Sequence, residues 1–139
     1  MTVQHIVRRS AASTAAVNTA VAVDLPIDST AATPITSPGG NITEIVADFV
    51  RTGAEVASES VLWSIRLSGA ALPDGPQDFS FGGMTNGASS TALIPTPPNR
   101  RVLGSPLALK VNLPLVIQAF WNGVDVGTPM AQVELVIES

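Results

Sequence analysis

The chain has 139 residues, a length that fits one domain with a core of its own. It contains no cysteine and one histidine, His5, which excludes disulfides, thiolate metal sites and thiol nucleophiles and leaves little for a histidine-based triad. Charged residues make up only 13 % of the chain, whereas an ordinary soluble domain is about 25 % charged. Such sparse charge indicates a surface that neighbouring subunits cover, although a surface of Ser, Thr, Ala, Gly and Pro is an alternative.

The first fifteen residues predict an N-terminal arm, because they are small or polar and include the basic pair Arg8-Arg9. Val, Thr, Leu and Ile then occupy every second position from Val17 to Ile27, a period typical of a half-buried strand. A proline and a polar cluster end this strand. Residues 28–41 contain two prolines and a Gly-Gly pair, which predict loops and turns.

Residues 41–53 fit two interpretations. Their apolar positions have helical spacing, Asn41 with Glu44 resembles a capping box, and Gly53 suits a helix end. The β character of the remaining chain favours a strand instead. As a strand, the segment has two faces: Ile45, Ala47 and Phe49 on one, and Ile42, Val46 and Val50 on the other.

The middle of the chain contains further predicted strands. A short strand over residues 78–81 follows the loop 71–76, and Gly82-Gly83 opens the next loop. A short apolar run covers residues 91–94. The longer strands have alternating residues: Val61, Trp63, Ile65 and Leu67 against Leu62, Ser64, Arg66 and Ser68, and then, after Arg100-Arg101, the series Leu107, Leu109, Val111 and Leu113.

The C-terminal third predicts a β-hairpin, because residues 115–121 and 124–126 flank Asn122-Gly123 and Asn-Gly supplies the positive φ angles of a type I′ turn. A last alternating strand follows residues 127–129. The whole chain is therefore predicted to be all-β, a jelly roll or β-sandwich of about eight antiparallel strands. Residues 1–15 are the extended N-terminal arm, and residues 16–139 form the single domain.

Candidate catalytic and metal-binding groups are few. Asp74 with Asp78, and Asp24 with Asp28, are the acidic pairs suited to hold Ca²⁺ or to act as a glycosidase pair. Neither pair has ligand spacing, and Asp at a strand end is typical of turns. His5 has no second ligand beside it. We therefore expect no enzymatic activity, no metal, no cofactor and no small-molecule substrate.

The basic pairs and the aromatic residues are the candidate contact residues. Arg8-Arg9, on the arm, could bind nucleic acid or lipid headgroups. For both Arg8-Arg9 and Arg100-Arg101, however, the net charge of −4 favours solvated charges or ion pairs with a neighbouring subunit. Trp63 shares a face with apolar residues and is expected in the core, whereas Trp121, beside the Asn-Gly turn, is expected at an interface. The alternative is an aromatic platform for sugar, built from Trp63, Phe79, Phe81, Phe120 and Trp121.

Three segments carry a resemblance to a known family: Ile42-Thr43-Glu44-Ile45, the strand from Val61 to Gly69, and the closing run from Leu113 to Glu138. Their strand rhythm over residues 15–138 resembles the single jelly-roll capsid proteins of tailless icosahedral bacteriophages and related viruses. The resemblance implies a coat subunit of the virion that assembles with its own copies and with other capsid proteins into an icosahedral shell. Because only Arg8 and Arg9 charge the arm, it implies weak contact with nucleic acid, or contact with an internal membrane.

Two other classes of protein fit the same composition. A secreted or surface β-sandwich module that binds carbohydrate or mediates adhesion would behave as a monomer, and a capsid decoration or cement protein would bind only preformed shells. Assembly behaviour therefore separates the three classes. The residues expected at subunit contacts are Arg8, Arg9, Arg100, Arg101 and Trp121.

Overall fold

A computed structural model of the chain describes residues 1–12, 18–52, 60–85, 99–124 and 128–139. These residues form β-strands and no helix, which confirms the all-β prediction. The strands are β1 (Val3–Arg9), β2 (Val21–Ala22), β3 (Leu25–Pro26), β4 (Ile35–Thr36), β5 (Asn41–Thr52), β6 (Ser60–Ser68), β7 (Gln77–Thr85), β8 (Asn99–Ala108), β9 (Pro114–Val124) and β10 (Thr128–Glu138).

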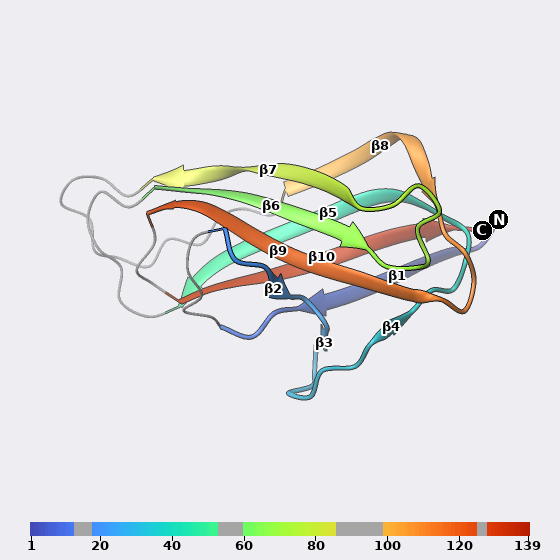
Figure 1. Cartoon of the computed structure of the whole chain (residues 1–139), viewed down its shortest axis with the longest axis horizontal. Helices are drawn as coiled ribbons and strands as arrows, with labels where there is room; N and C mark the ends of the chain where they lie inside the picture. The colour runs from blue at the N-terminus through green and yellow to red at the C-terminus, as the bar shows by residue number, and fades with distance from the viewer. Residues whose placement is uncertain (13–17, 53–59, 86–98, 125–127) are drawn as a thin grey trace.

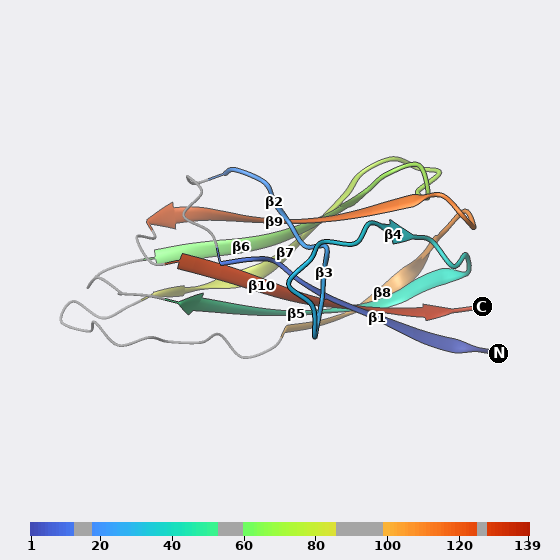
Figure 2. The same ribbon diagram turned by 90° about the horizontal axis from the view of Figure 1, so that it is seen from below.

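The strands form two antiparallel sheets that lie against each other as the layers of a sandwich (Figure 1 and Figure 2). Sheet A has the strand order β3-β1-β10-β5-β8, and sheet B has the order β2-β9-β6-β7, with β4 added along β9. From β5 onward the chain changes sheet repeatedly, since β5, β8 and β10 belong to sheet A and β6, β7 and β9 to sheet B. Strands far apart in the sequence therefore build each layer.

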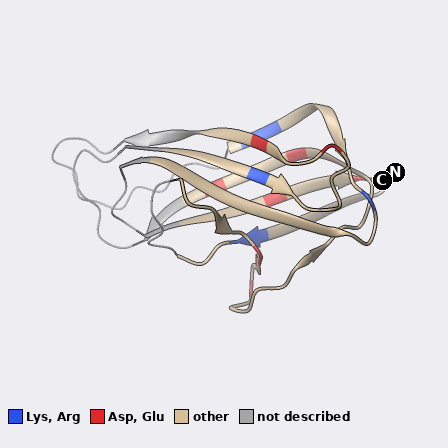
Figure 3. Ribbon diagram, viewed as in Figure 1, with Lys and Arg blue, Asp and Glu red and all other residues tan. Residues whose placement is uncertain are grey.

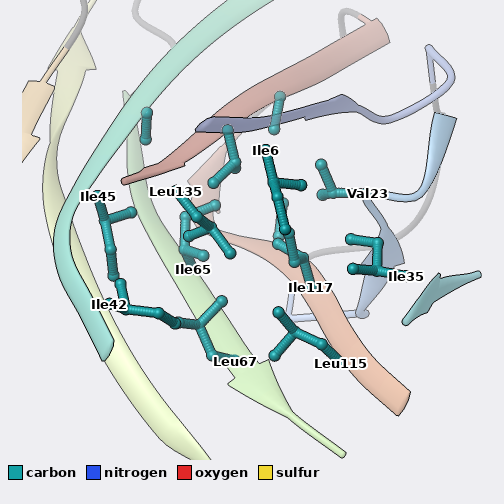
Figure 4. Close-up of a cluster of buried hydrophobic side chains, with 14 of the residues drawn as sticks. Ile6, Val23, Ile35, Ile42, Ile45, Ile65, Leu67, Leu115, Ile117 and Leu135 are labelled. Carbon is teal, nitrogen blue, oxygen red and sulfur yellow. The ribbon is translucent and has the colours of Figure 1, made fainter. Parts of the chain in front are cut away.

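Side chains that point between the sheets form one hydrophobic core. Figure 4 shows how the layers meet, with Ile45 and Leu135 of sheet A facing the same interior as Ile65 and Ile117 of sheet B. The alternation of each long strand supplies these residues, because every second side chain points inward. Trp63 is 2 % exposed, so the prediction that it lies in the core is confirmed.

Residues 41–52, for which the sequence allowed a helix or a strand, form the strand β5. This strand pairs with β10 on one side and with β8 on the other. Ile45, Ala47 and Phe49 are fully buried, as the strand interpretation predicts. Ile42 is fully buried as well, although the sequence places it on the opposite face. The ladder to β10 skips Thr43, and this bulge turns Ile42 to the same side as Ile45. The spacing that imitates a helix is therefore an alternation interrupted by a bulge.

The alternating segment 17–27 does not form the single strand that was predicted. Its described part makes two short pairings in different sheets, β2 with β9 and β3 with β1. Between them, Val23 is fully buried and its N–H donates to the carbonyl of Ile117 at 2.9 Å. Beyond them, Ile27 is 44 % exposed. The single strand is wrong because the chain here crosses from one layer to the other and closes this side of the sandwich.

The residues assigned to an N-terminal arm are part of sheet A over the length of β1. This strand pairs with β10 from Val3, opposite Glu138, to Arg9, opposite Gln132. Ser10 is 1 % exposed, and its hydroxyl accepts a hydrogen bond from the N–H of Ala131 at 2.9 Å. The arm interpretation does not hold for these residues, because β10 supplies a pairing partner that the local sequence does not reveal. Residues 13–17 lie outside the described part of the chain.

Asn122 and Gly123 lie inside β9 rather than in a turn. They pair with Leu62 and Val61 of β6, and β9 belongs to sheet B whereas β10 belongs to sheet A. The predicted type I′ hairpin is therefore wrong. An Asn-Gly turn requires that the flanking strands pair with each other, but here each strand has partners in its own sheet. Residues 125–127 lie outside the described residues.

β7 is longer than the predicted short strand and includes Gly82-Gly83, which the sequence assigns to a loop. In the ladder, Ser80 pairs with Ser64 and Gly83 pairs with Leu62. Two residues of β7 thus lie between these pairs, whereas only Trp63 of β6 does. β7 therefore carries one extra residue, and a glycine inside a strand often marks such a bulge.

β8 includes Arg100-Arg101 and ends at Ala108, earlier than the strand predicted to continue through Leu113. A turn follows in which Asn112 has a φ of 62°, a left-handed conformation that asparagine tolerates. The predicted apolar run over residues 91–94 lies outside the described residues.

Candidate assembly surface

Ionisable side chains are divided unequally between the two outer faces of the sandwich. The outer surface of β6, β7 and β9 is here named the sheet B face, and among its described residues only Arg66 and Asp78 are charged (Figure 3). The outer face of sheet A is richer in charge: it carries His5, Arg9, Glu44, Asp48, Arg100, Glu134 and Glu138.

The ion pair of the sheet B face is well aligned. Arg66 donates from Nε and from a terminal nitrogen to the two carboxylate oxygens of Asp78, at 2.7 and 3.2 Å. The guanidinium also lies over the ring of Phe120, 4.8 Å from its centroid. The hydrogen bond with Asp78 and the charge of that carboxylate raise the pKa of Arg66 above its ordinary value. The pair therefore gives the sheet B face no net charge.

Around this ion pair the sheet B face is apolar or small and polar. Leu62 is 62 % exposed and Val116 is 40 % exposed, while Phe120 is half-buried under Arg66. The remaining outward residues carry hydroxyl or amide groups: Ser64, Ser68, Ser80, Gln118 and Asn122. Leu62 and Val116 lie toward opposite ends of the ladder between β6 and β9, so the sheet B face combines scattered apolar side chains with neutral polar groups and one ion pair. Such depletion of charge is typical of the central part of a protein–protein interface.

One end of the sheet B face is hollowed. An open depression of about 280 Å³ lies there. It is lined by residues of β6 and of its neighbours on either side: Asn18, Leu62, Trp63, Ser64, Ser80 and Asn122. Its polar groups are neutral hydroxyls and amides. The depression gives an inserted side chain from a neighbouring molecule both apolar contact and hydrogen-bond partners.

Sequence reasoning did not select this face as a contact surface, although it named Asp78 and Phe120 for other roles. The sequence does contain a signal for Leu62. It is the one apolar residue among the outward-facing positions of β6, which otherwise hold Ser64, Arg66 and Ser68. Val116 and Phe120 could not be assigned, because the predicted hairpin paired β9 with the wrong strand.

In the first basic pair, Arg9 makes hydrogen bonds within the chain. Arg9 donates to the carbonyl oxygens of Ile27 and Ser29, at 3.3 and 2.6 Å, and so ties β1 to the turn after β3. Arg8 is half-buried, and its Nε has no hydrogen-bond partner in the described residues.

The second basic pair lies at the opposite edge of sheet A. Arg100 approaches Glu44 to 2.7 Å, close enough for an ion pair although not aligned as a hydrogen bond. Arg101 donates to the carbonyl oxygen of Ser80 and lies over the rings of Phe79 and Phe81, so it joins β8 of sheet A to β7 of sheet B. The two basic pairs are therefore not brought together into one site.

The structure places Trp121 in the core rather than at an exposed interface. It is 3 % exposed, and its ring centroid lies 5.7 Å from that of Trp63. The outward-facing alternate position belongs to half-buried Phe120, because β9 continues through the predicted turn and keeps its alternation. Among the described residues no aromatic platform for sugar is uncovered, since Trp63, Phe81 and Trp121 are buried and an arginine lies over each of Phe79 and Phe120.

The acidic residues do not gather. Within the described part of the chain, no group of three or more His, Cys, Asp and Glu side chains is placed to hold a metal ion. Asp78 is engaged by Arg66. His5 lies 2.5 Å from Glu134 through Nδ1, on the outer face of sheet A.

Searches of protein-family models and of curated proteins find no match to this chain. None of the described residues forms a helix long and apolar enough to cross a bilayer.

Proposed function

We propose that this chain is a structural capsid subunit, which assembles with its own copies and with other capsid proteins into the shell of a virion. The observation that carries the proposal is the sheet B face, a broad sheet surface with exposed Leu62 and Val116 and a single neutral ion pair. Covering such a surface with another subunit removes apolar area from water without leaving a charge unpaired.

The strand order supports a jelly-roll form of the sandwich. In sheet A the first strand lies beside the last, as β1-β10-β5-β8, and sheet B has the complementary order β2-β9-β6-β7. This arrangement corresponds to two interlocked Greek keys, a fold used by viral capsid proteins and also by lectins and cupins. Because the fold serves several functions, it supports the proposal only together with the sheet B face.

The contacts of the basic residues disfavour direct packaging of a genome. Arg9 and Arg101 are occupied by carbonyl oxygens of the same chain, and Arg100 lies beside Glu44. Few free cations remain in the described residues to neutralise phosphates, which nucleic-acid binding requires. Genome or membrane contact is therefore a minor part of the proposed role.

A pair of arginine substitutions tests the proposal. Leu62→Arg places a charge on the sheet B face, and Val102→Arg places the same charge on the outer face of sheet A, where Val102 is 72 % exposed. Both sites are exposed, so we expect both variants to keep the fold, as circular dichroism would report. We expect Leu62→Arg to raise the protein concentration needed for assembly about tenfold or more, since one buried unpaired charge costs well over 1.4 kcal/mol.

Val102→Arg should assemble like the wild type in sedimentation and electron microscopy. Equal behaviour of the two variants would contradict an assembly role for the sheet B face. A wild-type chain that stays monomeric but binds a preformed capsid would identify a decoration protein instead.

A further inference from the structure

We infer that the outer edge of β1 docks against β1 of a second copy of this chain, so that sheet A continues across two subunits. β3 covers this edge only at Arg8 and Arg9. From Val3 to Val7, no strand among the described residues pairs on that side. Figure 2 shows β1 running clear of β3 toward the N-terminus.

The hydrogen bonds on the covered side of β1 fix which groups face outward. Thr2 and Ser139 exchange two backbone bonds, of 3.3 and 3.0 Å. Bonded pairs alternate along an antiparallel ladder, so the even-numbered residues of β1 bond to β10. The N–H and C=O groups of Val3, His5 and Val7 therefore point away from β10, toward the open edge.

The other long edges of the sandwich carry features that oppose pairing, and β1 does not. In β8, Pro106 lacks an N–H, and the register with β5 breaks between Val102 and Leu107. In β7, a bulge interrupts the strand and the carbonyl of Ser80 already accepts Arg101. Edge strands without a proline, bulge or lysine are the ones available to another chain. β1 contains none of the three.

A second β1 fits this edge in an antiparallel arrangement with a two-fold axis through His5. The axis sets His5 opposite its own counterpart and Val3 opposite Val7 of the other copy. Each of these pairs then exchanges both backbone hydrogen bonds. Val3 is 46 % exposed and Val7 is half-buried, so each Val3–Val7 pair also gains apolar contact.

The choice of a second copy as occupant rests on the proposed self-assembly, and charge is compatible with it. His5 lies beside Glu134 of its own chain, and no other residue from Val3 to Val7 is ionisable. A two-fold contact of this kind closes after two copies. Because strand-edge pairing buries less area than a standard interface, the isolated dimer is expected to be weak and to strengthen within a shell.

Disulfide mapping tests the register directly, since the chain has no cysteine of its own. His5→Cys sets two thiols at the axis, about 5.5 Å apart between Cα atoms, which a disulfide can span. Val3→Cys is the matched control on the same strand, because its two copies lie about 14 Å apart. We expect His5→Cys to cross-link at least about tenfold faster than Val3→Cys, and a mixture of Val3→Cys with Val7→Cys to form heterodimers.

Equal cross-linking of His5→Cys and Val3→Cys, or no heterodimer from the mixture, would overturn the inference. Repeating the series in the Leu62→Arg background separates the two proposals, because that change blocks the sheet B face and leaves β1 intact. The expected cross-linking pattern without shell formation by the wild type would support the edge contact and contradict the capsid role. Shells that form without the expected cross-linking pattern would support the capsid role and contradict the edge contact of β1.

Discussion

Three aromatic rings pack against one another in the core between the two sheets. Phe49 of sheet A stacks on Trp63 of sheet B, with ring centroids 4.5 Å apart. Trp121 packs against Trp63 from the same sheet. Stacked aromatic pairs add to the stability that burial alone provides. Alternation in the sequence identifies Trp63 as a core residue, but it cannot place Trp121, because that assignment depends on where β9 ends.

Removing the central ring tests this packing. We expect Trp63→Ala to lower the free energy of unfolding by about 3–5 kcal/mol, because it leaves a large cavity between the sheets. Denaturant titration of the wild type and the variant measures the difference. A loss below about 1 kcal/mol would place Trp63 at the surface and contradict the core described above.

Asp48 provides a test that depends on pH. Partial burial raises the pKa of this carboxyl above its ordinary value of 3.8. Between the ordinary pKa and the raised pKa, the folded chain therefore holds a proton that the unfolded chain has released. Stability therefore falls as pH rises from about 3.8 through the raised pKa, and the deficit remains at neutral pH. We expect Asp48→Asn to be more stable than the wild type at pH 7 and to lose that advantage below the ordinary pKa. An advantage of equal size at both pH values, in urea titrations, would contradict the stated cause.

At the scale of the element, the long strands could be predicted from the sequence, whereas their partners and irregularities could not. β6 and β10 follow from alternation, because each has one buried face. The bulge at Thr43 and the bulge in β7 depend on the register with neighbouring strands, which local sequence does not contain. The Asn-Gly signal misleads for the same reason, since long-range pairing in each sheet overrides a local turn preference.

Arg101 links β8 of sheet A to β7 of sheet B. Arg101 bonds to the carbonyl of Ser80 and contacts two phenylalanine rings, 5.2 and 5.9 Å from their centroids. We expect Arg101→Ala to cost about 1–3 kcal/mol of unfolding free energy. Arg100→Ala is the matched control and should cost about 0–1 kcal/mol, because both arginines are exposed but Arg100 makes an ion pair with Glu44 and contacts neither phenylalanine ring. Equal losses in denaturant titrations would show that Arg101 does not join the sheets.

At the scale of the whole molecule, charge is distributed unequally between the two outer faces of the sandwich. The low charge content in the sequence predicts that some surface is covered, but composition cannot say which one. Strand pairing assigns most of the charged residues of the strands to the outer face of sheet A and one neutral pair to the sheet B face, so the sheet B face is the one that we propose to be covered. The aqueous side of the subunit is therefore expected to be the outer face of sheet A.

The proposed assembly role is tested most directly by measuring the mass of the wild-type chain in solution as a function of concentration. We expect sedimentation velocity to show growth from the 14.3 kDa subunit to large closed particles as the concentration rises, with particles of uniform size in electron micrographs. A single 14.3 kDa species at every concentration, up to the limit of solubility, would contradict the assembly role proposed for this chain.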